Sequence, residues 1–189
     1  VYDRARGHED RPWCRTVSCT HPHDPYVARK KYWDLYEDCD HLLPEVGAIP
    51  YEDQDAHSKR IFDANDWRSF DITEEDIRRS RRAYFANISY LDDKIGEVME
   101  ALEATRQEAV ILFVSDHGDM LGERGLWFKM SFYEGSSRVP MMVAAPNMAV
   151  TYTHFRAHET KANLVCPLLL ETHNNNETLV YRRLTAEPN

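Results

Sequence analysis

Asp116, His117 and Lys129 combine residue types that can bind a cation and an anion. Asp116 and His117 directly follow an apolar run at residues 109–115, and Lys129 lies in an aromatic and apolar stretch. Carboxylate oxygens suit hard ions such as Ca²⁺ and Mg²⁺, and a lysine in apolar surroundings commonly has an anionic partner, here a tetrahedral oxyanion. The residues predict a metal- and anion-binding corner, although a strand-terminal Asp-His pair is more often an ordinary turn.

A second candidate is the segment His21-Pro22-His23-Asp24, which follows a β-prone run at residues 13–20. Histidine titrates near neutral pH, so His23 or His21 can accept a proton or donate one to a leaving oxygen. An ordinary polar loop, extended by its prolines, explains the same residues equally well.

A serine nucleophile is an alternative for the same corner. It would be Ser115 or Ser131, with His117 as the base and Asp24 or Glu134 as its partner. No G-x-S-x-G elbow accompanies either serine, so the sequence argues against this chemistry.

Predicted strands end at both candidate sites. Residues 13–20 and 139–145 are β-prone, and residues 109–115 form the continuous apolar run that is typical of a buried parallel strand. A long helix is predicted between the strand at residues 13–20 and the strand at residues 109–115. Strand, helix and strand in this order indicate an α/β fold with parallel strands, although three strands are few for a complete domain.

The long helix is predicted from about residue 74 to about residue 105, because Thr73 and Asp76 resemble a capping box. Apolar residues recur at spacings of three, four or seven and predict an amphipathic helix with one buried stripe: Ile77, Tyr84, Ile88, Leu91, Ile95, Val98 and Leu102. Four arginines in this helix favour a solvated face over a phosphate site: Arg78, Arg79, Arg81 and Arg82.

The remaining segments carry weaker patterns. Residues 50–70 are polar and without a period, so we expect a long surface excursion. From residue 147 onward we expect only a short buried element at residues 164–170 and a polar turn at residues 173–177.

Composition limits the classes of partner. The 189 residues carry a net charge of −9, so nucleic acid and anionic membrane surfaces are not expected as partners. No apolar run is long enough to span a bilayer. The four cysteines have wide, irregular spacing, which favours reduced thiols in a cytoplasmic protein.

These pieces occur together, and in this order, in sulfatases of the alkaline-phosphatase superfamily. Ser115-Asp116-His117-Gly118-Asp119-Met120-Leu121-Gly122-Glu123, followed by Lys129 and by residues 133–140, resembles the family's C-terminal metal motif and the strand after it. Further segments resemble the members that hydrolyse choline sulfate: residues 21–27, 33–38, 82–92 and 125–131. The resemblance covers residues 1–146 and implies the C-terminal part of a sulfatase catalytic domain, incomplete at its N-terminal side, with an unrecognised tail at residues 147–189.

The resemblance implies a sulfuric ester hydrolase with a small sulfate ester as substrate, choline sulfate in particular. A formylglycine made from cysteine would attack the ester, assisted by a divalent cation, Ca²⁺ by expectation with Mg²⁺ or Mn²⁺ as alternatives. Asp116 and His117 would bind the metal, and Lys129 would contact the sulfate. His23, with His21 as the second candidate, would bind sulfate or assist the leaving oxygen. A homo-oligomer is also compatible with this reading.

The chain departs from the family pattern in its nucleophile. None of its four cysteines lies in a C-x-P-x-R or C-x-A-x-R motif, and the family's N-terminal Asp-Asp metal pair is absent. We therefore expect a fragment or truncated relative that lacks the nucleophile for activity as an isolated chain. Two alternatives stay open, a hydrolase of phosphonate or phosphate monoesters from the same superfamily and a catalytically inactive remnant. An unrelated α/β binding domain would require the motif order to be a coincidence.

Overall fold

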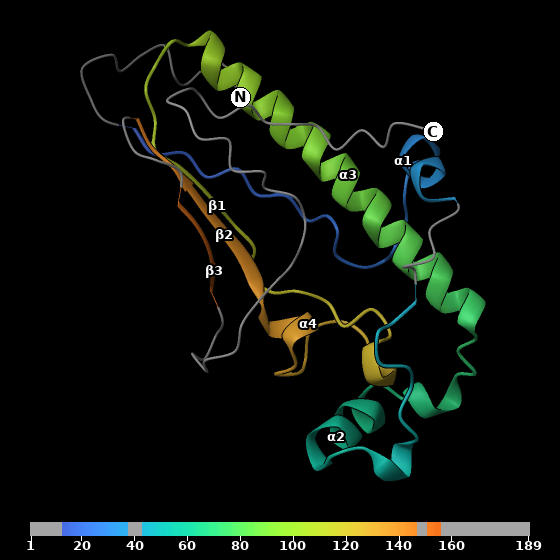
Figure 1. Ribbon diagram of the computed structural model, residues 1–189. Helices are drawn as coiled ribbons and strands as arrows, with labels where there is room; N and C mark the ends of the chain where they lie inside the picture. Colours follow the sequence, from blue (N-terminus) through green and yellow to red (C-terminus); the bar gives the residue numbers. More distant parts are fainter. Residues whose placement is uncertain (1–12, 38–42, 147–150, 156–189) are drawn as a thin grey trace.

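The computed structural model describes residues 13–37, 43–146 and 151–155, the last of these as backbone only. Figure 1 shows a long helix beside a small sheet, with the shorter helices gathered mainly at the end of the molecule where the long helix begins. The elements in chain order are α1 (Lys30–Trp33), η2 (Asp34–Tyr36), η4 (Tyr51–Asp53), α2 (Ala56–Ala64), η5 (Trp67–Ser69), α3 (Glu74–Ala104), β1 (Ile111–Val114), η6 (Glu123–Gly125), α4 (Glu134–Ser137), β2 (Val139–Ala144) and β3 (Thr151–Phe155).

Helix α3 confirms the predicted long helix and its capping box. The Asp76 amide donates to the Thr73 hydroxyl at 3.2 Å, and the Thr73 amide donates to the Asp76 carboxylate at 3.1 Å. The predicted buried stripe is not confirmed, because none of its seven apolar residues is fully buried and Ile88 and Val98 are exposed. The buried residues of α3 are small or polar: Ala83, Ala86 and Asn87. Both α1 and η2 pack against α3, and the contact includes Tyr32 with Asp93 and Tyr36 with Ser89 instead of residues of the predicted stripe.

The four arginines of α3 do not form one solvated face. Arg78 pairs with Glu74 along the helix at 2.9 Å. Arg81 is largely buried and donates to the backbone oxygen of Leu121 at 3.0 Å. Arg82 donates to the backbone oxygen of Trp33 at 2.9 Å. The last two arginines therefore attach the helix to neighbouring segments.

The sheet is antiparallel, so the prediction of parallel strands is wrong for the described residues. Its order is β1-β2-β3, with Leu112 opposite Val143 and Val114 opposite Met141. The chain leaves β1, folds into the loop and short helices at residues 115–138, and returns along the same strand as β2. Helix α3 is consequently not a crossover between two parallel strands of this sheet.

Two local predictions are corrected by the structure. Residues 13–20 are exposed and form no strand, because none of the described strands β1, β2 and β3 pairs with them. Residues 50–70 are not an irregular excursion but contain η4, α2 and η5. Helix α2 is capped by Asp55, whose carboxylate accepts from the amides of His57 at 2.8 Å and Ser58 at 3.1 Å. This cap stabilises a helix whose apolar period is too short to detect in the sequence.

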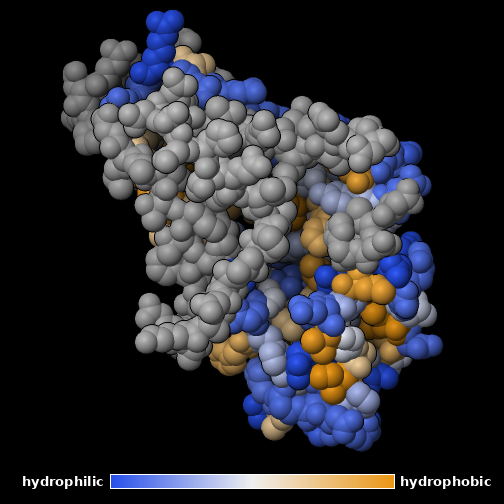
Figure 2. All heavy atoms as spheres, viewed as in Figure 1, coloured by the Kyte–Doolittle hydropathy of each residue, from blue (hydrophilic) through white to orange (hydrophobic). Residues whose placement is uncertain are grey.

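The core joins α2 and η5 to the loop that follows β1. Its buried residues are Ile61, Trp67, Met120, Leu126 and Trp127. On the face shown in Figure 2, mostly hydrophilic residues cover the described surface, with apolar patches between them. Among the described helices, none is long and apolar enough to cross a membrane. Because Met120, Leu126 and Trp127 belong to the core, the core fixes the loop at residues 115–131, which carries the first candidate site.

Several predictions concern residues beyond this core. Cys14 and Cys19 are free thiols, as expected, whereas Cys39 and Cys166 lie outside the described residues. The elements predicted at residues 164–170 and 173–177 also lie outside them. Strand β3 pairs with β2 from beyond the predicted boundary at residue 146, and that boundary stays a prediction.

Candidate functional site

The loop after β1 is held by its own backbone. The Gly118 amide donates to the Ser136 carbonyl at 2.8 Å, which ties the start of the loop to α4. The Met120 amide donates to the Phe128 carbonyl, also at 2.8 Å, which closes the loop on itself. Three non-glycine residues of the loop have positive φ angles, 49° at Leu121, 60° at Arg124 and 62° at Phe128. Such left-handed residues persist where surrounding contacts enforce them, and they cluster at functional sites.

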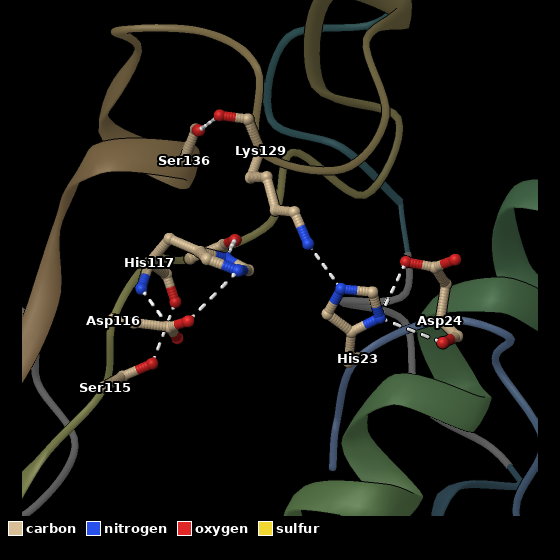
Figure 3. A network of polar contacts seen from close by, with 8 residues as sticks. His23, Asp24, Ser115, Asp116, His117, Lys129 and Ser136 are labelled. Carbon is tan, nitrogen blue, oxygen red and sulfur yellow. Dashed lines mark hydrogen bonds and ion pairs between the residues drawn. The ribbon is translucent and has the colours of Figure 1, made fainter. Parts of the chain in front are cut away.

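Lys129 and His23 meet although they are 106 residues apart in the chain. The Lys129 Nζ contacts the His23 Nε2, and Figure 3 shows the lysine side chain extending from its loop toward the imidazole. The other ring nitrogen, His23 Nδ1, lies 2.9 Å from the backbone oxygen of Asp24 and 3.0 Å from its carboxylate. Nδ1 therefore carries a proton that it donates to Asp24, and Nε2 is left to face the lysine. Both side chains are partly accessible, so a small anion can reach them.

His117 lies across from this pair, with its ring centroid 6.0 Å from that of His23. Its Nδ1 lies 2.8 Å from the Gly118 carbonyl, and its Nε2 lies 3.5 Å from the Asp116 carboxylate. A proton on Nδ1 then leaves a lone pair on Nε2, the arrangement by which a backbone carbonyl prepares a histidine to bind metal. The Asp116 side chain is 86% exposed and accepts from the His117 amide at 3.0 Å.

The Asp116 and His117 pair suits a cation chemically but does not complete a site. Ca²⁺ prefers about six to eight oxygen ligands, and these residues supply one carboxylate and one imidazole. Within the part of the chain that the structure describes, no three His, Cys, Asp or Glu residues come together as metal ligands. The described residues therefore fit one side of a cation site at most.

His21 is not brought to the same point. Its ring packs edge-on against Tyr90 of α3, with centroids 4.9 Å apart. His21 and His23 nevertheless line one open cavity of ≈ 410 Å³, together with Asp24 and Arg29. His21 thus lines a cavity next to His23, whereas His23 is the histidine that contacts Lys129.

The serine alternative gains no support from the geometry. The Ser115 hydroxyl donates to the backbone oxygen of His117 at 2.8 Å rather than to an imidazole. The Ser131 hydroxyl is buried and has no hydrogen-bond partner among the described atoms. Neither serine is therefore prepared as a nucleophile by a neighbouring base.

Sequence reasoning missed two residues behind the site, Asp119 and Tyr26. The Tyr26 hydroxyl donates to the Asp119 carboxylate at 2.7 Å, and the two residues are 93 positions apart. Burial raises the pKa of Asp119, while its hydrogen bonds from Tyr26 and the backbone oppose that shift. Asp119 lies in the quoted motif, but its sequence position does not distinguish a buried acceptor from a solvent-facing acid.

Comparison with known proteins identifies relatives of the chain. A model of the sulfatase family matches residues 2–166. The choline-sulfatase of Rhizobium meliloti (strain 1021) is 65% identical over 154 residues, which are 79% of this chain and 30% of that protein. The arylsulfatase of Clostridium perfringens (strain 13 / Type A) is 34% identical over 72% of this chain and 28% of its own length. The iduronate 2-sulfatase of Mus musculus is 32% identical over 71% of this chain and 27% of its own length. The chain thus spans less than a third of each of these relatives.

Proposed function

Because the chain belongs to the sulfatase family, we propose that its described residues form the sulfate-binding and leaving-group side of a sulfuric ester hydrolase site. The observation that carries the proposal is the contact between Lys129 Nζ and His23 Nε2 at the end of the loop after β1. A cation and an imidazole that converge from distant segments form a site for a tetrahedral oxyanion.

The two side chains have complementary parts in this proposal. Lys129 donates to the sulfate oxygens and offsets their charge. Asp24 holds His23 by Nδ1, so Nε2 is the atom that faces the anion. When Nε2 carries a proton, it can donate that proton to the bridging oxygen as the alcohol leaves. This chain then supplies both the acid, His23, and the positively charged group that binds the anion, Lys129.

The chain offers two ligands for the family's divalent cation but no formylglycine motif for its nucleophile. The family's divalent cation would be held by Asp116 and His117, with Ca²⁺ expected and Mg²⁺ or Mn²⁺ as alternatives, and it would neutralise sulfate oxygens. These two ligands do not complete a site among the described residues. No cysteine among the 189 residues lies in a formylglycine motif, so the proposal assigns this chain binding and proton donation, not attack on sulfur.

Choline sulfate is the proposed substrate of the protein. The support is 65% identity over 79% of the chain to a protein named choline-sulfatase. Phosphate and phosphonate monoesters are the second candidate, because their anions have the same shape and would meet the same Lys129 and His23. A cytoplasmic location and a homo-oligomeric state stay predictions from the sequence.

Sulfate binding by the full 189-residue chain tests the proposal. Isothermal titration with choline sulfate is expected to show that Lys129→Met weakens binding at least about tenfold, the cost of one charge-assisted hydrogen bond. Lys94→Met is the matched control, because Lys94 pairs with Glu97 on α3 and the substitution makes the same change in net charge. Equal losses in both variants, or none in Lys129→Met, would contradict the proposal. Stronger binding of an aryl phosphonate than of choline sulfate would favour the second candidate.

A further inference from the structure

The Asp119 carboxylate is a partly buried acceptor beside the site. Its Oδ1 accepts from the backbone amides of Leu121 at 2.9 Å and Phe128 at 3.1 Å. Its Oδ2 accepts from the Tyr26 hydroxyl at 2.7 Å. One side chain therefore connects both ends of the loop at residues 121–128 with the segment that carries His23. Removing such an acceptor would leave buried donors without partners, which is costly.

Phe128 shows what the hydrogen bond to Asp119 does for Lys129. Phe128 precedes Lys129 and has a φ angle of 62°, a left-handed conformation that phenylalanine disfavours. Its amide is held by Asp119 and its carbonyl accepts from the Met120 amide at 2.8 Å. These two hydrogen bonds, one to the Asp119 side chain and one from the Met120 backbone, thus enforce the turn from which the Lys129 side chain departs toward His23 (Figure 3).

Tyr26 makes the corresponding connection for His23, which lies three residues before it. The Tyr26 ring contacts Tyr84 of α3, Trp127 and Phe128, with centroid separations of 6.2, 6.4 and 6.1 Å. Burial, and then the nearby Asp119 carboxylate, raise the pKa of the Tyr26 hydroxyl well above its ordinary value. The hydroxyl therefore stays protonated at neutral pH and remains a donor.

We propose that Asp119 and Tyr26 are positioning residues that hold His23 against Lys129. Asp119 fixes the backbone before Lys129, Tyr26 fixes the segment after His23, and their mutual hydrogen bond sets the separation of the two functional side chains. The inference rests on the proposed function for what the pair binds, whereas the positioning itself is a property of the chain without substrate.

Tyr26→Phe in the full chain tests this inference, because it keeps the packed ring and removes only the hydroxyl. The direct measurement is the nuclear Overhauser effect between the Lys129 methylene at Cε and the His23 ring protons, without ligand. The signal is expected in the wild-type chain and is expected to be lost or strongly weakened in Tyr26→Phe. Sulfate binding, measured in parallel by titration, is expected to weaken about tenfold, since small displacements of positioned groups have large effects.

Tyr84→Phe is the matched control. Tyr84 is a second partly buried tyrosine near Asp119, and its hydroxyl donates to none of the described residues. This variant is expected to keep both the signal and the affinity. If Tyr26→Phe keeps the wild-type signal while its melting temperature falls, Tyr26 is merely structural and the inference is overturned. A wild-type chain without the signal also overturns it. A wild-type chain that shows the signal but binds no sulfate overturns only the proposed function.

Discussion

At the scale of single residues, Gly118 shows how closely the loop packs against α4. A Cβ atom at this position would lie 2.1 Å from the backbone oxygen of Gly135. The Gly118 amide also donates to the Ser136 carbonyl at 2.8 Å, so the two backbones cannot separate without losing this bond. We expect Gly118→Ala to lower the free energy of unfolding by about 2–3 kcal/mol, the range for overpacking a tight contact. Urea denaturation followed by circular dichroism measures it.

Gly96→Ala is the control for this substitution. Gly96 lies within α3, and a Cβ atom there would meet nothing within 4 Å. Alanine is the better helix former, so this variant is expected to gain about 0.5–1 kcal/mol. Opposite signs for the two variants would locate the loss in the contact between Gly118 and Gly135. A Gly118→Ala chain as stable as the wild type would contradict that contact.

At the scale of elements, Asp55 links the start of α2 to the core. Its carboxylate accepts from the Ser58 hydroxyl at 2.5 Å, from two backbone amides and from the Tyr133 hydroxyl at 2.9 Å. We expect Asp55→Ala to lower the free energy of unfolding by about 1–2 kcal/mol at pH 7, as for loss of an N-cap.

The hydrogen bonds from Ser58 hold the pKa of Asp55 well below its ordinary value of 3.8. A lowered folded-state pKa stabilises the fold above pH 3.8, and this contribution is lost as the pH falls below that value.

The measurement is thermal unfolding of the wild type and of Asp55→Ala at pH 7 and at pH 3. We expect the difference between their melting temperatures to be smaller at pH 3 than at pH 7. Asp55→Asn is the control, since asparagine also caps helices but does not titrate in this range. At neutral pH it is expected to be less stable than the wild type and more stable than Asp55→Ala, because it keeps the capping acceptor but loses the charge. If alanine and asparagine destabilise the chain equally, the side-chain cap does not stabilise α2.

The elements that the sequence predicted correctly are those with local causes. The capping box at Thr73 and the apolar run before Ser115 each lie within one element, so α3 and β1 could be found from their own residues. The antiparallel pairing of β1 with β2 depends on how residues 115–138 fold back, which no local pattern encodes. The residue types of His23 and Lys129 were sufficient to nominate both, but their contact spans 106 positions and depends on the core. Tyr26 and Asp119 were missed for the same reason.

At the scale of the whole molecule, strands β1 and β2 are apolar on both faces. One face carries the cross-strand pairs of Leu112 with Val143 and of Val114 with Met141, and the other face carries Ile111, Phe113, Met142 and Ala144. Leu112 and Val114 are 56% and 53% exposed. Strands with two apolar faces are normally covered on both sides, and exposed apolar strands promote association between chains. The net charge of −9 opposes association only at long range and is screened by salt.

Leu112→Lys is therefore expected to reduce self-association of the 189-residue chain. The substitution places a charge on the exposed face of β1, where it blocks apolar contact between two copies. Because the side chain is more than half exposed, the free energy of unfolding is expected to change by less than about 0.5 kcal/mol. Sedimentation velocity over a range of concentrations measures the association. Val98→Lys is the control, since Val98 is 43% exposed on α3 and the substitution makes the same change in charge. Equal dissociation by both variants would show that charge, not the apolar face of β1, controls assembly. A wild-type chain that stays monomeric at every concentration would contradict the prediction.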